Sequence, residues 1–422
     1  MKHTILTFIT KVEPSKVEEL REFLSAIAGA ADLAANPHLP FGSLKLLHFA
    51  SLVIHEDETY GPYLIFENNF DGSLDAYLDE LYENAAEGLH RMYSSCRDYP
   101  AGSSAERERI LSYLRAHVVR PNAYHIGNVG RSVERIRRED GLRDNLENFL
   151  DGIVKGGRDK EPPGVLRQEV QSFARSRPDY EWVANATPRQ TGMERFLPWF
   201  NIILAALSAL VLLPLIILPS IVWAIVLRRK EKRDRELSDL GNHGHVMRLV
   251  EREDRTQVVQ NHLAHMTLVK PGRFRRATLG GVLWLVNLVA RTSTSGTLSG
   301  IPSIHFAHWA LIDDGRRLLF LSNFDGSWEN YLDDFIDKAS VGLTAIWSNT
   351  VDFPRTSFLF YEGSRNGTLF KAWARKTQTY TNVWYSAYKH LTVQSVDNNS
   401  SIREDLLRPL DETATRSWLW RF

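Results

Sequence analysis

Two histidines and two aspartates stand at matching places in this sequence and have the greatest capacity for chemistry. His48 and His305 each begin a His-Phe-Ala triplet, and Asp71 and Asp325 each lie in the pentapeptide Asn-Phe-Asp-Gly-Ser. A histidine near neutral pH can transfer a proton or bind a metal or haem. A strand histidine is more commonly retained for packing or for a hydrogen bond. The pattern therefore identifies the positions and leaves both roles open.

These residues recur because a long stretch of the sequence occurs twice. Segments 69–100 and 323–354 align without a gap, begin with the same pentapeptide and are identical at nearly half of their positions. Other matching positions follow in the same order along the chain: Pro14 with Pro271, His48 with His305, Asn122 with Asn382, and Leu142 with Ile402. This collinearity indicates an internal duplication, over about 1–150 and about 260–410.

Each copy is expected to fold as a strand, a helix, two strands joined by a hairpin, a long helix, a last strand and a terminal helix. Alternating apolar residues predict the strands, and apolar stripes at helical spacing predict the helices. This order is that of the ferredoxin-like split β-α-β arrangement. The elements expected in the first copy are a strand over 3–12, a helix over 15–30, strands over 44–54 and 63–67, a helix over 74–93, a strand near 122–127 and a helix over 131–150.

The pentapeptide lies where the third strand ends and the long helix begins. We expect Asp71 or Ser73 to accept hydrogen bonds from the first turn of that helix, and Gly72 to allow the turn. Gly88 and Gly342 occupy matching positions inside the long helix of each copy, where glycine costs about 1 kcal/mol relative to alanine. Their retention predicts that another backbone, or a ligand, approaches closely there, packing being the commoner cause.

An apolar segment between the copies, Leu197–Leu227, predicts contact with a membrane. It contains no charged residue and is longer than the ~20 residues that a helix needs to cross a bilayer. A basic cluster over 228–235 follows it, so the C-terminal side of the segment is predicted to be cytoplasmic. The expected organisation is a first repeat over 1–150, a polar linker over 151–196, the membrane segment over 197–227, a basic linker over 228–258, and a second repeat with a tail over 259–422.

Two topologies are open for the membrane segment. A single crossing would place the first copy outside, although the N-terminal sequence does not have the pattern of a signal peptide. A hairpin bent at Pro214 and Pro219 would instead return to the same side, with Trp199 and Trp223 at one interface. The hairpin keeps both repeats together on the cytoplasmic face of the membrane. It is the topology that we expect.

The first helix of the second copy offers a further contact with lipid. It is apolar over Leu279–Ala290 and begins with Arg273, Arg275 and Arg276. Arginines at the start of an apolar helix are typical of interfacial helices that meet anionic headgroups. Burial of the helix against the other copy explains the same pattern equally well.

The overall composition narrows the class of partner. Lys+Arg and Asp+Glu both number 51, so the formal net charge is zero, which argues against a nucleic-acid partner. The single cysteine, Cys96, excludes an internal disulfide and a cysteine-based zinc cluster. The expected partners are membrane lipid and a small apolar ligand. A homo-oligomer stays open, because the copies can pair within one chain or between chains.

In its duplicated element order the sequence resembles the dimeric α/β-barrel superfamily, which includes dye-decolorising peroxidases and chlorite dismutases. In that superfamily two ferredoxin-like units pair their sheets face to face. The Gly-x-x-Asp-Gly motif of the peroxidases is matched only in Asp71–Gly72 and Asp325–Gly326; its first glycine and its arginine are absent. The resemblance implies an α+β fold of tandem ferredoxin-like repeats that form a pseudo-dimeric α/β barrel, with the membrane segment between them.

The same resemblance implies a function, a membrane-attached ligand-binding barrel with haem-dependent, peroxidase-like chemistry on an apolar substrate. In that scheme His305, or His48 in the other copy, ligates the haem, and Asp325 or Asp71 is the acid–base group. The alternative is a non-enzymatic membrane-bound module that binds a lipid or organises a partner. The sequence has no H-E-x-x-H, P-loop or G-x-S-x-G motif, which motivates this alternative.

Overall fold

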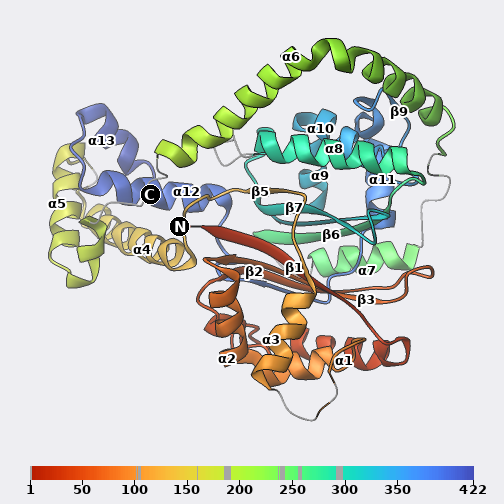
Figure 1. Cartoon of the computed structure of the whole chain (residues 1–422). Helices are drawn as coiled ribbons and strands as arrows, with labels where there is room; N and C mark the ends of the chain where they lie inside the picture. The colour runs from red at the N-terminus through yellow and green to blue at the C-terminus, as the bar shows by residue number, and fades with distance from the viewer. Residues whose placement is uncertain are drawn as a thin grey trace.

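The computed structural model is a mixed α+β structure with antiparallel sheets (Figure 1). It describes residues 2–100, 102, 106–158, 160–184, 192–235, 237, 243–254, 259–290 and 298–422. The elements of the first half are β1 (His3–Lys11), α1 (Val17–Ala28), β2 (Leu47–His55), β3 (Tyr63–Asp71), α2 (Leu74–Tyr93), α3 (Arg107–Ala116), β4 (Val118–Val119), β5 (Ala123–Ile126), α4 (Val133–Lys155) and α5 (Pro163–Arg175).

The second half begins with a long helix and then follows a similar order. Its elements are α6 (Gly192–Glu231), α7 (His243–Asp254), β6 (Gln260–Leu268), α8 (Arg273–Ala290), β7 (Ile304–Ile312), β8 (Arg317–Asp325), α9 (Trp328–Lys338), α10 (Ser340–Trp347), β9 (Thr356–Ser357), β10 (Tyr361–Glu362), α11 (Gly367–Thr377), β11 (Val383–Ser386), α12 (Val393–Leu406) and α13 (Glu412–Leu419). Each half thus contains a strand, a helix, a pair of hairpin strands, further helices and a short last strand.

The two halves exchange their short last strands. One sheet has the order β11-β2-β3-β1-β4 and the other has the order β5-β7-β8-β6. In these sheets β5 of the first half lies antiparallel to β7, with Tyr124 opposite His308. In the same way β11 of the second half lies antiparallel to β2, with Tyr385 opposite Ala50. Each half therefore completes the sheet of the other.

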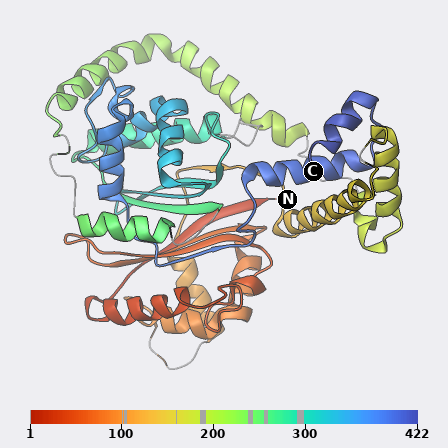
Figure 2. The ribbon, with the colours of Figure 1, turned by 180° about the vertical axis from the view of Figure 1, so that it is seen from behind.

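The two sheets lie face to face, and helices cover their outer faces (Figure 1, Figure 2). Helices α1, α2 and α3 cover the first sheet, and α8 to α11 cover the second. Between the sheets, side chains of both halves form a shared core: Ile9, Val53, Ile65, Ala264, Met266, Ala310, Leu319 and Leu321. Both faces of β2 are covered, which explains why every residue of this strand before His55 is buried.

Helices α4, α5, α12 and α13 pack together at one side of the sheets (Figure 1). Their core includes Leu146, Val170, Ile402 and Trp418. The stretch expected to be a polar linker thus contains a helix, α5, whose apolar face is buried against the C-terminal helices. The stretch expected to be a basic linker likewise contains α7.

Helix α6 carries the apolar segment and bends in its middle. The axes of Trp199–Leu212 and Ile217–Glu231 differ by 99°, and Pro214 lies in the break. No one helix in the described ranges has the length and apolar character to cross a bilayer, whereas these two parts meet that test together. A proline removes a backbone donor and clashes with the preceding turn, which accounts for the position of the bend.

The apolar side chains of α6 lie mostly on the outside. Val211 and Leu215 at the bend are 77% and 72% exposed, and Leu197 and Trp199 near the start are about half exposed. The other end of the segment packs on the body. Trp223 donates a hydrogen bond from its indole nitrogen to Thr278 Oγ1 on α8 (3.1 Å), and Leu227 is buried.

The start of α8 only partly matches the two alternatives predicted for this helix, namely contact with lipid headgroups and burial against the other copy. Arg275 is buried and its guanidinium binds Asp234 Oδ2 at 2.5 Å, so this arginine does not reach a headgroup. Arg273 is exposed. One face of α8 packs on the second sheet through Leu279 and Leu283, while its other face leaves large apolar side chains exposed: Trp284, Leu285 and Val289.

Candidate functional site

The four residues singled out in the sequence meet at one end of the space between the sheets. His48 Nε2 lies 3.1 Å from Asp71 Oδ1, and His305 Nε2 lies 2.7 Å from Asp325 Oδ1. The ring of Tyr388 lies 5.7 Å from that of His48 and 5.9 Å from that of His305. The structure therefore brings the two His–Asp pairs together around one tyrosine.

Each aspartate also holds the start of a helix with its second oxygen. Asp71 Oδ2 accepts a hydrogen bond from the N–H of Val133 (2.9 Å), the first residue of α4. Asp325 Oδ2 accepts one from the N–H of Val393 (2.8 Å), the first residue of α12. A carboxylate at a helix N-terminus satisfies an N–H group that has no partner within the helix. The aspartates thus cap the terminal helices.

The remaining residues of the pentapeptide build the turn in which the aspartate sits. Ser73 Oγ accepts a hydrogen bond from Ala76 N (3.3 Å), so the serine caps α2, as one of the two alternatives predicted. Ser327 caps α9 in the same way. Gly72 and Gly326 have φ of +87° and +83°, which L side chains rarely adopt. The turn prediction is therefore confirmed.

The His–Asp pair of the first half, together with His3, has the spacing of a metal site but not the chemistry of one. The nitrogen and oxygen atoms of His3, His48 and Asp71 lie within 4.8 Å of one another. However, His3 Nε2 accepts a hydrogen bond from the N–H of Gly130 (2.7 Å), so its proton is on Nδ1, 3.0 Å from Asp71 Oδ1. A metal on Nδ1 would have to replace that proton and leave the ring with none. We therefore interpret the cluster as a hydrogen-bond network.

The residues present do not fit a haem at His48 or His305. Both side chains are buried, and the rings of Phe49 and Phe306 pack against them at 5.1 Å and 5.4 Å. His305 Nδ1 has no hydrogen-bond partner in the described part of the chain, but the His305 ring packs against the rings of Phe49 and Tyr388. An axial ligand needs an open face on which the macrocycle can lie. Burial also lowers the pKa of His48, although Asp71 opposes this shift.

A second polar cluster, which the sequence analysis did not identify, is buried between the sheets around Glu67. This carboxylate is inaccessible to solvent and accepts hydrogen bonds from Ser51 Oγ (3.0 Å) and from Asn69 Nδ2 (3.0 Å) and Asn323 Nδ2 (3.2 Å). Burial alone would raise the pKa of Glu67, but its bond with His262 Nε2 (3.0 Å) lowers it to about 2. The signal in the sequence was a glutamate that directly follows the apolar run Tyr63–Phe66 in a predicted strand.

Histidines of the second half complete this cluster. His308 Nδ1 lies 3.6 Å from Glu67 Oε1, and His308 Nε2 lies 3.1 Å from Thr7 Oγ1. His262 Nδ1 lies 2.9 Å from Thr381 Oγ1. Side chains from both halves thus contact the buried carboxylate, and the cluster links the two sheets through polar interactions.

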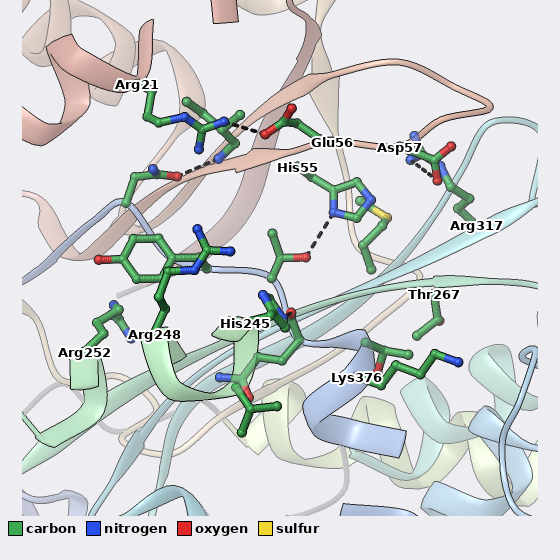
Figure 3. Close-up of a pocket in the computed structure, with 18 of the residues that line it drawn as sticks. Arg21, His55, Glu56, Asp57, His245, Arg248, Arg252, Thr267, Arg317 and Lys376 are labelled. Atoms are coloured by element: carbon green, nitrogen blue, oxygen red, sulfur yellow. Dashed lines mark hydrogen bonds and ion pairs between the residues drawn. The ribbon is translucent and has the colours of Figure 1, made fainter. Parts of the chain in front are cut away.

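The space for a ligand lies at the opposite ends of the same strands. A cavity of about 1100 Å³ opens between α1, the β2–β3 turn, α7, the end of β6 and the segment after α11 (Figure 3). Most of the residues that line it are polar or charged, among them the residues labelled in Figure 3: Arg21, His55, Glu56, Asp57, His245, Arg248, Arg252, Thr267, Arg317 and Lys376. The volume slightly exceeds the usual range of small-molecule sites, which is about 300–1,000 Å³.

Several charges that line the cavity are paired, while two arginines are not. Arg21 binds Glu56, and Lys376 Nζ lies 3.1 Å from Asp352 Oδ2. Within the described ranges, Arg248 and Arg252 form no hydrogen bond or ion pair, although the neighbouring Glu253 interacts electrostatically with Arg252. They are four residues apart on α7 and therefore lie on one face of that helix. This side of the cavity offers donors to an anionic group.

The far side of the cavity contains a buried arginine. Arg317 is inaccessible to solvent, and its guanidinium lies 4.3 Å from the centre of the Tyr63 ring. Its Nε donates to Asp313 Oδ2 (2.6 Å), whereas Nη1 and Nη2 have no hydrogen-bond partner among the described residues. Burial and the nearby Arg317 charge lower the pKa of His55 to about 4, so His55 is neutral at pH 7.

Comparisons with models of protein families, with curated proteins and with solved structures found no match to this chain. Function is therefore inferred from the residues and surfaces described above.

Proposed function

We propose that this chain is a membrane-attached, non-enzymatic binding protein built from two ferredoxin-like units in a pseudo-dimeric α/β barrel. The face-to-face antiparallel sheets and the matching element order of the two halves support this fold assignment. The exchange of β5 and β11 supports pairing within one chain. Halves that share strands must lie on the same side of a bilayer, and we place both on the cytoplasmic face.

The observation that carries the membrane assignment is the exposed apolar surface of α6. Large side chains along both parts of the helix project into solvent: Phe196, Leu197, Trp199, Phe200, Ile203, Leu204, Leu207, Leu210, Val211, Leu212, Leu215, Ile217, Leu218, Ile221, Val222 and Ile225. Removing one such side chain from water contributes about 1.5–3 kcal/mol. A contiguous surface of this kind marks an interaction site, and the basic residues that follow it favour an anionic membrane surface.

The ligand site in this proposal is the cavity between the halves. Its many charged lining residues, Arg248 and Arg252 among them, favour a ligand with an anionic group over the apolar ligand expected from the sequence. The buried His–Asp pairs support the non-enzymatic alternative, because aromatic side chains surround them and their hydrogen bonds hold helices α4 and α12 in place.

Sedimentation with phospholipid vesicles tests the attachment. The intact chain should pellet with vesicles, whereas a variant with Leu207→Ser, Val211→Ser and Leu215→Ser should stay largely in the supernatant. A matched control replaces three exposed apolar residues of the body, Val154, Val165 and Leu268, with serine and should still pellet. Equal pelleting of the α6 variant and the intact chain, or no pelleting of the intact chain, would overturn the proposal.

A further inference from the structure

The loop between β9 and β10 has a backbone conformation that bulky residues rarely adopt. Phe358 and Leu359 are consecutive and have φ of +51° and +72°. Positive φ at a residue with a large side chain is energetically unfavourable and persists only where the surroundings impose it. The loop must therefore be held by specific contacts.

Those contacts come from the last turn of α6. Glu231 is buried, and its carboxylate accepts hydrogen bonds from the N–H groups of Phe358 (2.9 Å) and Leu359 (2.8 Å) and from Thr356 Oγ1 (3.1 Å). The side chain of Leu359 is buried with Leu227 of α6. The conformation of the loop is thereby tied to the end of the apolar helix.

This arrangement turns aromatic side chains outward beside the apolar helix. Phe358, Phe360 and Tyr361 are 47%, 42% and 58% exposed. The guanidinium of Arg228 lies 5.6 Å from the centre of the Phe358 ring, and its Nη1 donates to Thr356 O (3.0 Å). Aromatic rings beside arginine side chains are typical of the level at which a protein crosses from lipid to water.

We propose that the loop Ser357–Tyr361 is a second membrane contact, which inserts Phe358 and Phe360 at the headgroup level of the bilayer that α6 enters. This inference rests on the proposed membrane attachment. Its occupant is lipid because the loop packs against the end of the apolar helix α6 and contacts Arg228, the first residue of the basic cluster that follows the apolar surface. The strained backbone keeps the aromatic rings outside the protein core while Leu359 anchors the loop.

Site-specific labelling tests the loop separately from the helix. The native Cys96 is buried, and burial raises the pKa of its thiol to about 12, so it should resist alkylation. Phe360→Cys reports on the loop, Val211→Cys on α6, and Glu83→Cys on the exposed face of α2 beyond the first sheet (Figure 1). Each full-length variant is labelled with a polarity-sensitive fluorophore and mixed with vesicles of equal parts phosphatidylcholine and phosphatidylglycerol.

The label at 360 should shift to shorter emission wavelength on addition of vesicles, as should the label at 211, while the label at 83 should not change. A shift at 211 without one at 360 would overturn the loop contact and leave the membrane attachment intact. No shift at either position would overturn both. If the label at 360 already emits at short wavelength before lipid is added, the loop lies in a contact between copies, and the proposal is overturned.

A serine variant provides a second measurement that does not depend on labelling. Phe358→Ser combined with Phe360→Ser should weaken partitioning into the same vesicles by tenfold or more, since two exposed aromatic side chains are lost, with an unchanged thermal midpoint. Unchanged partitioning would contradict the inference. A lowered thermal midpoint would contradict the view that both rings face away from the core.

Discussion

At the scale of single residues, the repeated pentapeptide performs a structural role that its sequence only partly indicated. The serine caps the following helix and the glycine has positive φ, as local turn chemistry predicts. The partner of Asp71 at the start of α4 could not be predicted, because more than 60 residues separate them in the chain. Local patterns determine caps within one turn, whereas such a distant contact depends on how the sheets assemble.

Replacing Asp71 with asparagine should destabilise the fold. The change removes the negative charge beside His3 and His48, and it can place an amide N–H against the N–H of Val133. Hydrogen bonds to charged groups contribute about 1.5–3 kcal/mol each, so we expect the free energy of unfolding to fall by roughly 2–3 kcal/mol. Chemical denaturation measures this, with Asp75→Asn on the exposed face of α2 as a control. Equal stability of the two variants would contradict the network.

The unpaired arginines of α7 predict binding of an anion in the cavity. Pyrophosphate should bind the intact chain in isothermal titration calorimetry, and Arg248→Ala with Arg252→Ala should weaken binding at least tenfold. The reason is the loss of two charge-assisted contacts, each worth about 1.5–3 kcal/mol. A control pair of exposed arginines, Arg408→Ala with Arg416→Ala, should leave affinity unchanged. Equal loss in both pairs would indicate a general charge effect and no site.

At the scale of elements, the sequence predicted most strands and long helices within a few residues. The pattern over 74–93 matches α2 (Leu74–Tyr93), and the expected strand near 122–127 matches β5 (Ala123–Ile126). The partner of β5 could not be predicted, because a short apolar strand has the same pattern in either sheet. Helices α5 and α7 were missed because charged residues dominate their exposed faces.

Gly88 and Gly342 occupy matching positions in the two copies but differ in how closely other atoms approach them. A Cβ at Gly88 would lie 2.0 Å from the carbonyl oxygen of His38, whereas a Cβ at Gly342 would have no atom within 4 Å. The predicted close approach is thus confirmed at Gly88 and wrong at Gly342. Gly88→Ala should lower the free energy of unfolding, and Gly342→Ala should leave it unchanged or raise it by up to about 1 kcal/mol. Denaturant unfolding of both variants checks this, and equal effects would contradict it.

At the scale of the whole molecule, buried titratable groups predict a loss of stability in acid. Burial lowers the pKa of His55, His265 and His308 to about 4, 3 and 4, from a usual 6.5. Between pH 6.5 and 4 the unfolded chain therefore binds more protons than the folded chain, so stability falls as the pH falls. Glu67, despite burial, has its pKa lowered from 4.5 to about 2 by His262, and its contribution to stability is lost progressively as the pH falls from 4.5 to about 2.

The thermal midpoint should therefore decrease steadily from pH 7 to pH 4. Circular dichroism at several pH values measures it, and His308→Gln should flatten the profile between pH 6.5 and 4 by removing one of the buried groups. His243→Gln is the control, since that side chain is exposed at the start of α7 and should leave the profile unchanged. A midpoint that does not change with pH would contradict the effect predicted for the buried histidines.

The exchange of β5 and β11 has a consequence for the order of events during synthesis on the ribosome. When the apolar part of α6 leaves the exit tunnel, β2 still lacks its neighbour β11, which is made more than 150 residues later. An unpaired strand edge invites pairing with other chains, so the nascent first half needs protection. Early capture of α6 by a membrane would hold each nascent chain apart from its neighbours. A chain truncated before Val383 should accordingly aggregate or pair the open edge of β2 with a second copy, which light scattering of the purified fragment would reveal.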